Sequence, residues 1–164
     1  MDDWTLLVLL LGSIIALTTF VTIIARRRFK GGITIAAVAS ILGIFAGVSG
    51  ASHGPGEILQ GNIAPGGIII EAWPALTLLA GGPAMTLIPS FNISGIVTVI
   101  LGLAVTIWAA TYIQSKNGAL VLMLLSTIML FVGGGLIPPM FGVVAGIIGL
   151  RVRQKDLKTS HQKV

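Results

Sequence analysis

Long apolar runs, separated by short polar or glycine-rich stretches, make up most of the chain. Residues 5–25, 33–50 and 93–113 contain no charged side chain. Each run approaches the roughly 20 residues needed for a helix to cross the hydrocarbon core of a bilayer. The runs are apolar on all sides rather than along one stripe, which is typical of helices surrounded by lipid. The pattern therefore predicts a transmembrane helix in each of these three ranges.

The last apolar block, residues 119–150, is too long for one crossing. A single helix over this block would be roughly 48 Å long, whereas the hydrocarbon core is about 30 Å thick. Gly133-Gly134-Gly135 and Pro138-Pro139 interrupt the block near its middle. Proline suits the first turn of a new helix. We therefore expect a hairpin of two crossings, 119–134 and 138–151, and four crossings in total if the hairpin is absent.

These elements predict an all-α membrane protein, a small polytopic bundle of about five transmembrane segments. Residues 1–153 form one membrane-embedded domain, and residues 154–164 form a polar, frayed cytoplasmic tail. Between the second and third helices, residues 51–92 are too apolar for a hydrated loop and too rich in proline and glycine for a crossing. We expect them to form an irregular apolar cap on the extracytoplasmic side, and we call residues 51–92 the outer cap.

Charge sets the expected orientation and excludes several functions. Only 9% of the residues are charged, whereas a soluble domain usually has about 25%. The basic residues gather in 26–30, at Lys116 and in the C-terminal tail, so they indicate cytoplasmic ends rather than nucleic-acid binding. The N-terminus is then expected outside and the C-terminus in the cytoplasm, and the expected location is the plasma (inner) membrane. The absence of cysteine excludes disulfides and thiolate catalysis.

Small residues recur at helical spacing within the apolar runs. Such ridges allow two helix backbones to approach closely in a membrane. Packing within the chain is the simpler interpretation, and a dimer face is the alternative. The residues expected at helix contacts are Ala39, Gly43, Gly47, Gly95, Gly102, Gly142, Gly146 and Gly149.

The outer cap contains the residues that could carry chemistry. His53 and Glu57 are four residues apart, and Glu71 follows three isoleucines, where a carboxylate is costly and often functional. Asn62 and Trp73 are further candidates because they could support Glu71. One imidazole and two carboxylates could ligate a divalent metal or act as acid and base. However, Pro55 and Gly56 make helical spacing between His53 and Glu57 uncertain, and a solvated loop would explain the same residues.

Three classes of function remain open. The first is an accessory or assembly component that presents the outer cap to lipid, to a second copy or to a partner membrane protein. The second is a small transporter or channel with Glu71 as its ion or proton site. The third is a membrane enzyme that acts on lipid through His53, Glu57 and Glu71. The sequence contains no nucleotide-binding or hydrolase motif and implies no cofactor, so the first class is favoured.

Overall fold

The structure is a computed structural model that describes residues 23, 35–74 and 82–161, with side chains up to Arg151. The predicted first crossing at 5–25, except Ile23, and the basic residues at 26–30 lie outside the described residues. The described elements are α2 (Ile35–Ala51), α3 (His53–Leu59), β1 (Ile69–Glu71), β2 (Pro83–Met85), α4 (Phe91–Thr111), α5 (Gly118–Leu130) and α6 (Ile137–His161).

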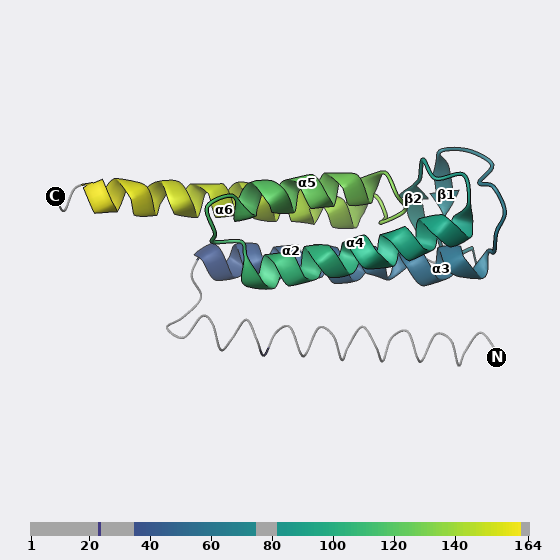
Figure 1. The fold of residues 1–164 in the computed structure, drawn as a ribbon, viewed down its shortest axis with the longest axis horizontal. Coiled ribbons are helices and arrows are strands. Elements are labelled where there is room, and N and C mark those ends of the chain that lie inside the picture. Colours follow the sequence, from purple (N-terminus) through teal and green to yellow (C-terminus); the bar gives the residue numbers. More distant parts are fainter. Residues whose placement is uncertain (1–22, 24–34, 75–81, 162–164) are drawn as a thin grey trace.

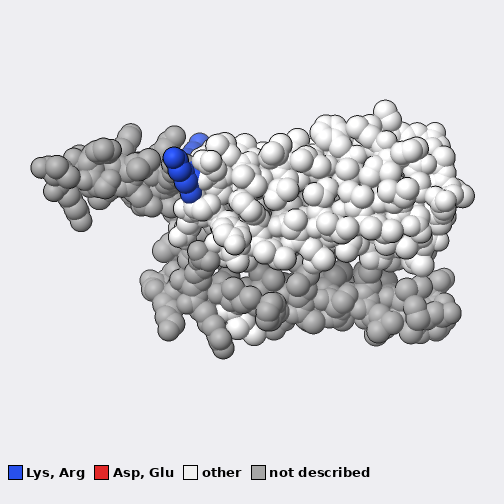
Figure 2. Space-filling model, in the orientation of Figure 1, with Lys and Arg blue, Asp and Glu red and all other residues white. Residues whose placement is uncertain are grey.

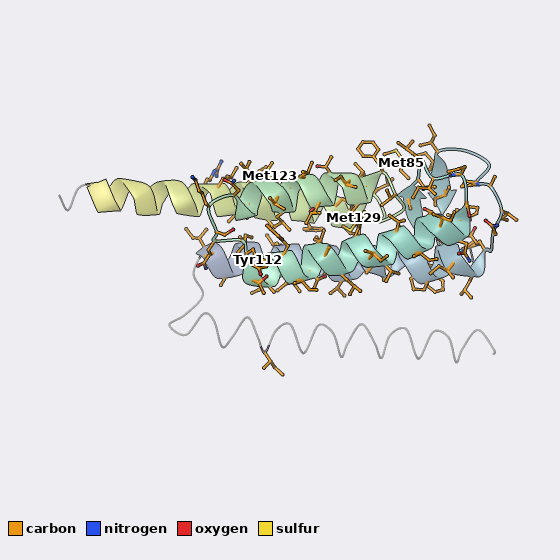
Figure 3. All side chains as sticks on the ribbon, viewed as in Figure 1. Met85, Tyr112, Met123 and Met129 are labelled. Carbon is orange, nitrogen blue, oxygen red and sulfur yellow. The ribbon has the colours of Figure 1, made fainter. Side chains whose placement is uncertain are left out.

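The long helices form a bundle of two layers (Figure 1). Helices α2 and α4 lie side by side in one layer, and α5 and α6 lie in the other. Helix α2 joins the layers because it packs against both α4 and α6. In Figure 3, Met129 of α5 lies between the layers, and its sulfur contacts the backbone of α2 near Gly50.

Two helical stretches are long and apolar enough to cross a membrane, judged by length and composition. They are Ile35–Leu59, which joins α2 and α3, and Phe91–Thr111, which is α4. Two shorter apolar helices cover Gly118–Leu130 and Ile137–Arg151. The described part of the chain is therefore predominantly helical, as predicted, and contains two candidate membrane spans.

The turn between α5 and α6 depends on its glycines. Gly133 and Gly135 have φ values of 108° and 79°, which side chains other than glycine rarely adopt. Helix α6 then begins at Ile137, with Pro138 and Pro139 in its first turn. Proline is tolerated there because backbone N–H groups in the first turn have no hydrogen-bond partner within the helix. The predicted polar tail at residues 154–164 overlaps the end of this helix. Helix α6 continues to His161, because polarity does not prevent a helix and this segment contains Gln, Lys and Leu.

Close helix contacts occur at small residues. A Cβ added to Gly43 would lie 2.6 Å from Cβ of Ala109, so α2 and α4 approach as closely as their backbones allow. At Gly47 the added Cβ would meet backbone atoms of Thr106 and Gly102. A buried hydrogen bond from Ser40 to the carbonyl of Ala109, 2.8 Å long, ties the same two helices together.

The remaining small residues at predicted contacts also lie between helices. Gly95 faces the backbone of α3, Gly142 faces Ser126 of α5, and Gly146 and Gly149 lie against the first turn of α5. Ala39 is fully buried in the main core.

A pair of short strands lies at the end of the bundle where α5 and α6 meet (Figure 1). Strands β1 and β2 are antiparallel, with Ile69 opposite Met85. Beyond β2, Thr86 pairs with Val132, so the strands also attach to the α5–α6 turn. The residues predicted as an irregular cap therefore include a helix, α3, and a strand pair. The strand pair forms because a distant segment supplies the backbone partners of β1, which a local pattern does not reveal.

Candidate functional site

Helix α3 places His53 and Glu57 on successive turns of one helix. The sequence Gly54-Pro55-Gly56, which argued against helical spacing between His53 and Glu57, lies within α3. Pro55 is in the first helical turn, where its missing N–H costs little. The two glycines permit close packing, because an added Cβ would meet the carbonyl of Gly95 at Gly54 and the Trp73 ring at Gly56. Their role is therefore contact rather than chain reversal.

The side chain of Glu57 is fully buried, with an exposed fraction of 0%. Its carboxyl group occupies the space in which a side chain at Gly133 would stand. Neither carboxyl oxygen has a hydrogen-bond partner among the described residues. No lysine or arginine occurs between Lys30 and Lys116 in the sequence. A buried carboxylate without a partner is costly, so this arrangement requires a positive charge or a proton at Glu57.

The Ser94 hydroxyl beside Glu57 belongs to a hydrogen-bond network that reaches the α5–α6 turn. Ser94 of α4 faces the Glu57 carboxyl but donates to the carbonyl of Val132, at 3.0 Å. Thr98, one turn along α4, donates to the same carbonyl. The hydroxyl oxygens of Thr86 and Ser94 lie 2.8 Å apart, and either hydroxyl can be the donor.

The geometry around His53 fixes its tautomer. Its Nδ1 lies 3.0 Å from the carbonyl oxygen of Ser49, which can only accept a hydrogen bond. Nδ1 therefore carries a proton, and in the neutral ring Nε2 has the free lone pair. The Nε2 side of the ring lies against Gly135, where an added Cβ would be 2.7 Å away. The side chains of His53 and Glu57 thus each contact a glycine of the α5–α6 turn.

Glu71 is exposed, so the apolar residues next to it in the sequence do not bury its carboxylate. Along β1 the side chains alternate, and Ile70 is buried while Ile69 and Glu71 face outward. The neighbouring isoleucines do not form one buried group either, because Ile68 and Ile69 are exposed. The apolar neighbours of Glu71 in sequence do not surround it in space.

The remaining candidates tie the strand pair and its loops to the helices. Trp73 donates from Nε1 to the carbonyl of Ser52, at 2.9 Å, and its ring covers Gly56. Asn62 is exposed and accepts a hydrogen bond from Ser90 through Oδ1, at 2.7 Å. Gln60 donates to the backbone carbonyl of Glu71. These contacts support the structure rather than a reaction.

The three residues proposed as metal ligands are not brought together. Within the described ranges, no group of three His, Cys, Asp or Glu side chains could hold a metal ion. His53 and Glu57 share α3, whereas Glu71 faces away on β1. What the structure adds instead are the hydroxyls of α4 and the glycines of the α5–α6 turn. Ser94 and Thr98 are four apart inside an apolar run, which is the sequence signal that could have identified them.

The described charges lie at opposite ends of the bundle. Lys116 and Arg151 are near the connection between α4 and α5, and the one face shown in Figure 2 has basic side chains only at that end. Tyr112 marks the same end in Figure 3, whereas Met85 marks the end with the strands. His53, Glu57 and Glu71 all belong to the strand end. Among the described residues, the bundle therefore has its basic side chains at one end and its acidic side chains at the other.

Comparison of the chain with protein-family models, curated proteins and solved structures finds no match in any of the three.

Proposed function

We propose that the chain is a multi-pass integral membrane protein that serves as an accessory or assembly component. In this proposal it crosses the membrane five times and binds a partner membrane protein through the outer cap. The two candidate spans and the two shorter apolar helices support a membrane location. The basic residues at the α4–α5 end support a cytoplasmic position for that end, which places the outer cap outside.

Partner binding is supported by exposed apolar side chains on segments whose backbone is hydrogen-bonded to the rest of the protein. Ile68, Ile69 and Leu87 are 55%, 63% and 63% exposed. Their segments are held by backbone hydrogen bonds, including Thr86 N–H to the carbonyl of Ile68 and Leu87 N–H to the carbonyl of Phe131. A preorganised apolar surface loses little conformational entropy when it binds. Large exposed apolar patches of this kind are common at interaction sites.

The alternative functions have less support. Transport with Glu71 as the ion site is disfavoured, because Glu71 is exposed at the edge of the strand pair. An enzyme that acts on lipid through His53, Glu57 and Glu71 would need these side chains to converge, and Glu71 faces away from α3. Neither argument applies to a component that binds a partner, since such a protein needs a surface rather than a reaction centre.

Site-specific cross-linking in membranes tests the proposed function. A photoreactive amino acid at Ile69 should cross-link to one protein of defined mass. The matched control is Ile100 of α4, which is 61% exposed but lies within a candidate span and should contact lipid. A defined product at Ile69 and none at Ile100 would support the proposal. Only lipid adducts at both positions would refute it, and a product of twice the chain's mass would identify the partner as a second copy.

A further inference from the structure

We propose that Glu57 is a proton-binding site whose proton keeps the α5–α6 turn in contact with α3. When the carboxyl group ionises, the turn and strand β2 separate from α3, so that water reaches the charge. This inference is independent of partner binding by the outer cap. It rests on the burial of the carboxyl group, on the hydrogen bonds around it, and on the attachment of the turn to β2.

No positive charge compensates an ionised Glu57 within the described residues. The side chain is fully buried, and the described basic side chains, Lys116 and Arg151, lie at the other end of the bundle. Helices α2 and α4, strand β2 and the α5–α6 turn contain no titratable side chain, and β1 contains only Glu71, which is exposed. His53 lies one turn before Glu57 on α3, but neither carboxyl oxygen hydrogen-bonds to it. Since a buried charge without compensation is costly, this site accommodates the neutral, protonated carboxyl group.

The hydrogen bonds around the carboxyl group also favour its protonated form. The backbone N–H of Gly133, the turn residue against the carboxyl group, donates to the carbonyl of Met85, at 2.8 Å. Ser94, the α4 side chain that faces the carboxyl group, donates to the carbonyl of Val132 and has an oxygen that can accept. A protonated carboxyl group can donate to that oxygen, whereas a carboxylate can only accept. In this arrangement the proton therefore gives Glu57 a hydrogen bond that the ionised form lacks.

The α5–α6 turn covers the carboxyl group directly. A Cβ at Gly133 would overlap both carboxyl oxygens of Glu57, and the ring of His53 lies against Gly135 of the same turn. Helix α3 thus contacts the turn at two glycines. Because the Glu57 side chain has an exposed fraction of 0%, water can reach an ionised carboxyl group only if the turn moves away from α3.

The turn can move only together with β2, because hydrogen bonds join the two segments. Besides the bond from Gly133 to Met85, the backbone N–H of Leu87 donates to the carbonyl of Phe131, at 2.9 Å. Ala84 of β2 is fully buried in the small apolar cluster at this end of the bundle. Separation of the turn from α3 should therefore expose Ala84, which makes this residue a reporter of the movement.

Infrared spectroscopy of the purified full-length protein in detergent at neutral pH tests the protonation. A protonated carboxyl group has a C=O stretching band at a frequency where a carboxylate does not absorb. This band should be present in the wild type and absent from Glu57→Gln. Glu71→Gln is the matched control, because it removes an exposed carboxylate and should retain the band. If Glu57→Gln does not fold, Ser94→Ala decides, since loss of its hydroxyl should shift the band. A wild type without the band, or a band unchanged in both variants, would overturn the proposal.

Cysteine modification tests the movement of the turn. Ala84→Cys places a thiol at a buried position, and Ile69→Cys, at an exposed position, corrects for ionisation of the thiol itself. The ratio of their rates with a water-soluble thiosulfonate should rise about tenfold per pH unit, because the open form binds one proton fewer than the closed form. Added Glu57→Gln should make the ratio independent of pH. A ratio that is constant without Glu57→Gln, or that rises equally with it, would show that this carboxyl group does not control the turn.

Discussion

Replacement of Gly47 by leucine should separate the two candidate membrane spans. A Cβ at this position would lie 2.6 Å from the carbonyl oxygen of Gly102 and 2.5 Å from the backbone nitrogen of Thr106. Backbone atoms cannot move away by a rotamer change, so α2 and α4 must move apart by about 1 Å before the rest of the side chain is accommodated. Overpacking of this kind costs about 1–3 kcal/mol. We expect a value at the upper end of that range.

Two further terms modify the estimate. Leucine has a higher helix propensity than glycine, which recovers about 0.8 kcal/mol. Separation of the helices would also stretch the buried hydrogen bond from Ser40 to the carbonyl of Ala109, and hydrogen bonds between membrane helices contribute about 0.6 kcal/mol on average. These terms nearly cancel, so the net loss of unfolding free energy should be about 2–3 kcal/mol.

Reversible denaturation in mixed micelles measures this loss. Gly66→Leu is the matched control, because Gly66 is exposed and an added Cβ there meets nothing within 4 Å. The control should stay within about 0.5 kcal/mol of the wild type, as is usual for surface substitutions. Equal stability of Gly47→Leu and Gly66→Leu would show that α2 and α4 do not pack through this glycine.

The two remaining predictions concern topology and the outer cap. Reporter fusions after Lys116 and at Val164 should both be cytoplasmic, because basic residues concentrate there, and an external reporter at Val164 would restore the four-crossing arrangement. Ile69→Cys should react with a membrane-impermeant maleimide at least ten times faster than Ile70→Cys, since the two side chains are 63% and 6% exposed. Equal rates would contradict the alternation along β1.

The helices were predictable because their sequence signal is local. A run without charges indicates a helix in lipid wherever it lies in the chain, and the run at 93–113 corresponds to α4 at Phe91–Thr111. The hairpin at 119–151 was also recognised from its glycines and prolines, and α5 and α6 occupy it. The number of membrane crossings stays a prediction, as does their orientation. The helical fold class could thus be predicted from composition and pattern, because each helix depends mainly on residues within its own segment.

The strand pair was not predictable, because its partners are distant in sequence. Strand β1 has three residues, too few for a period-two pattern to be distinguished from an apolar loop. Its position depends on β2, and β2 in turn is continued by the pairing of Thr86 with Val132. Helix α3 was not predicted for a similar reason. Gly54 and Gly56 are typical of a turn, and their role in helix contacts depends on distant segments that pack against them.

The two carboxylates of the outer cap show why a site is harder to predict than a fold. Glu71 has apolar neighbours in sequence, yet a strand turns adjacent residues to opposite sides, and Glu71 is exposed. Glu57 has glycine and proline before it, yet it is fully buried. Its environment is supplied by Ser94 of α4 and by Gly133 of the α5–α6 turn, 37 and 76 residues further along the chain. The free-energy cost of a buried charge depends on the atoms that surround it in space and not on the residues next to it in the sequence. Burial in space therefore identifies Glu57, and not Glu71, as the buried carboxylate of the outer cap.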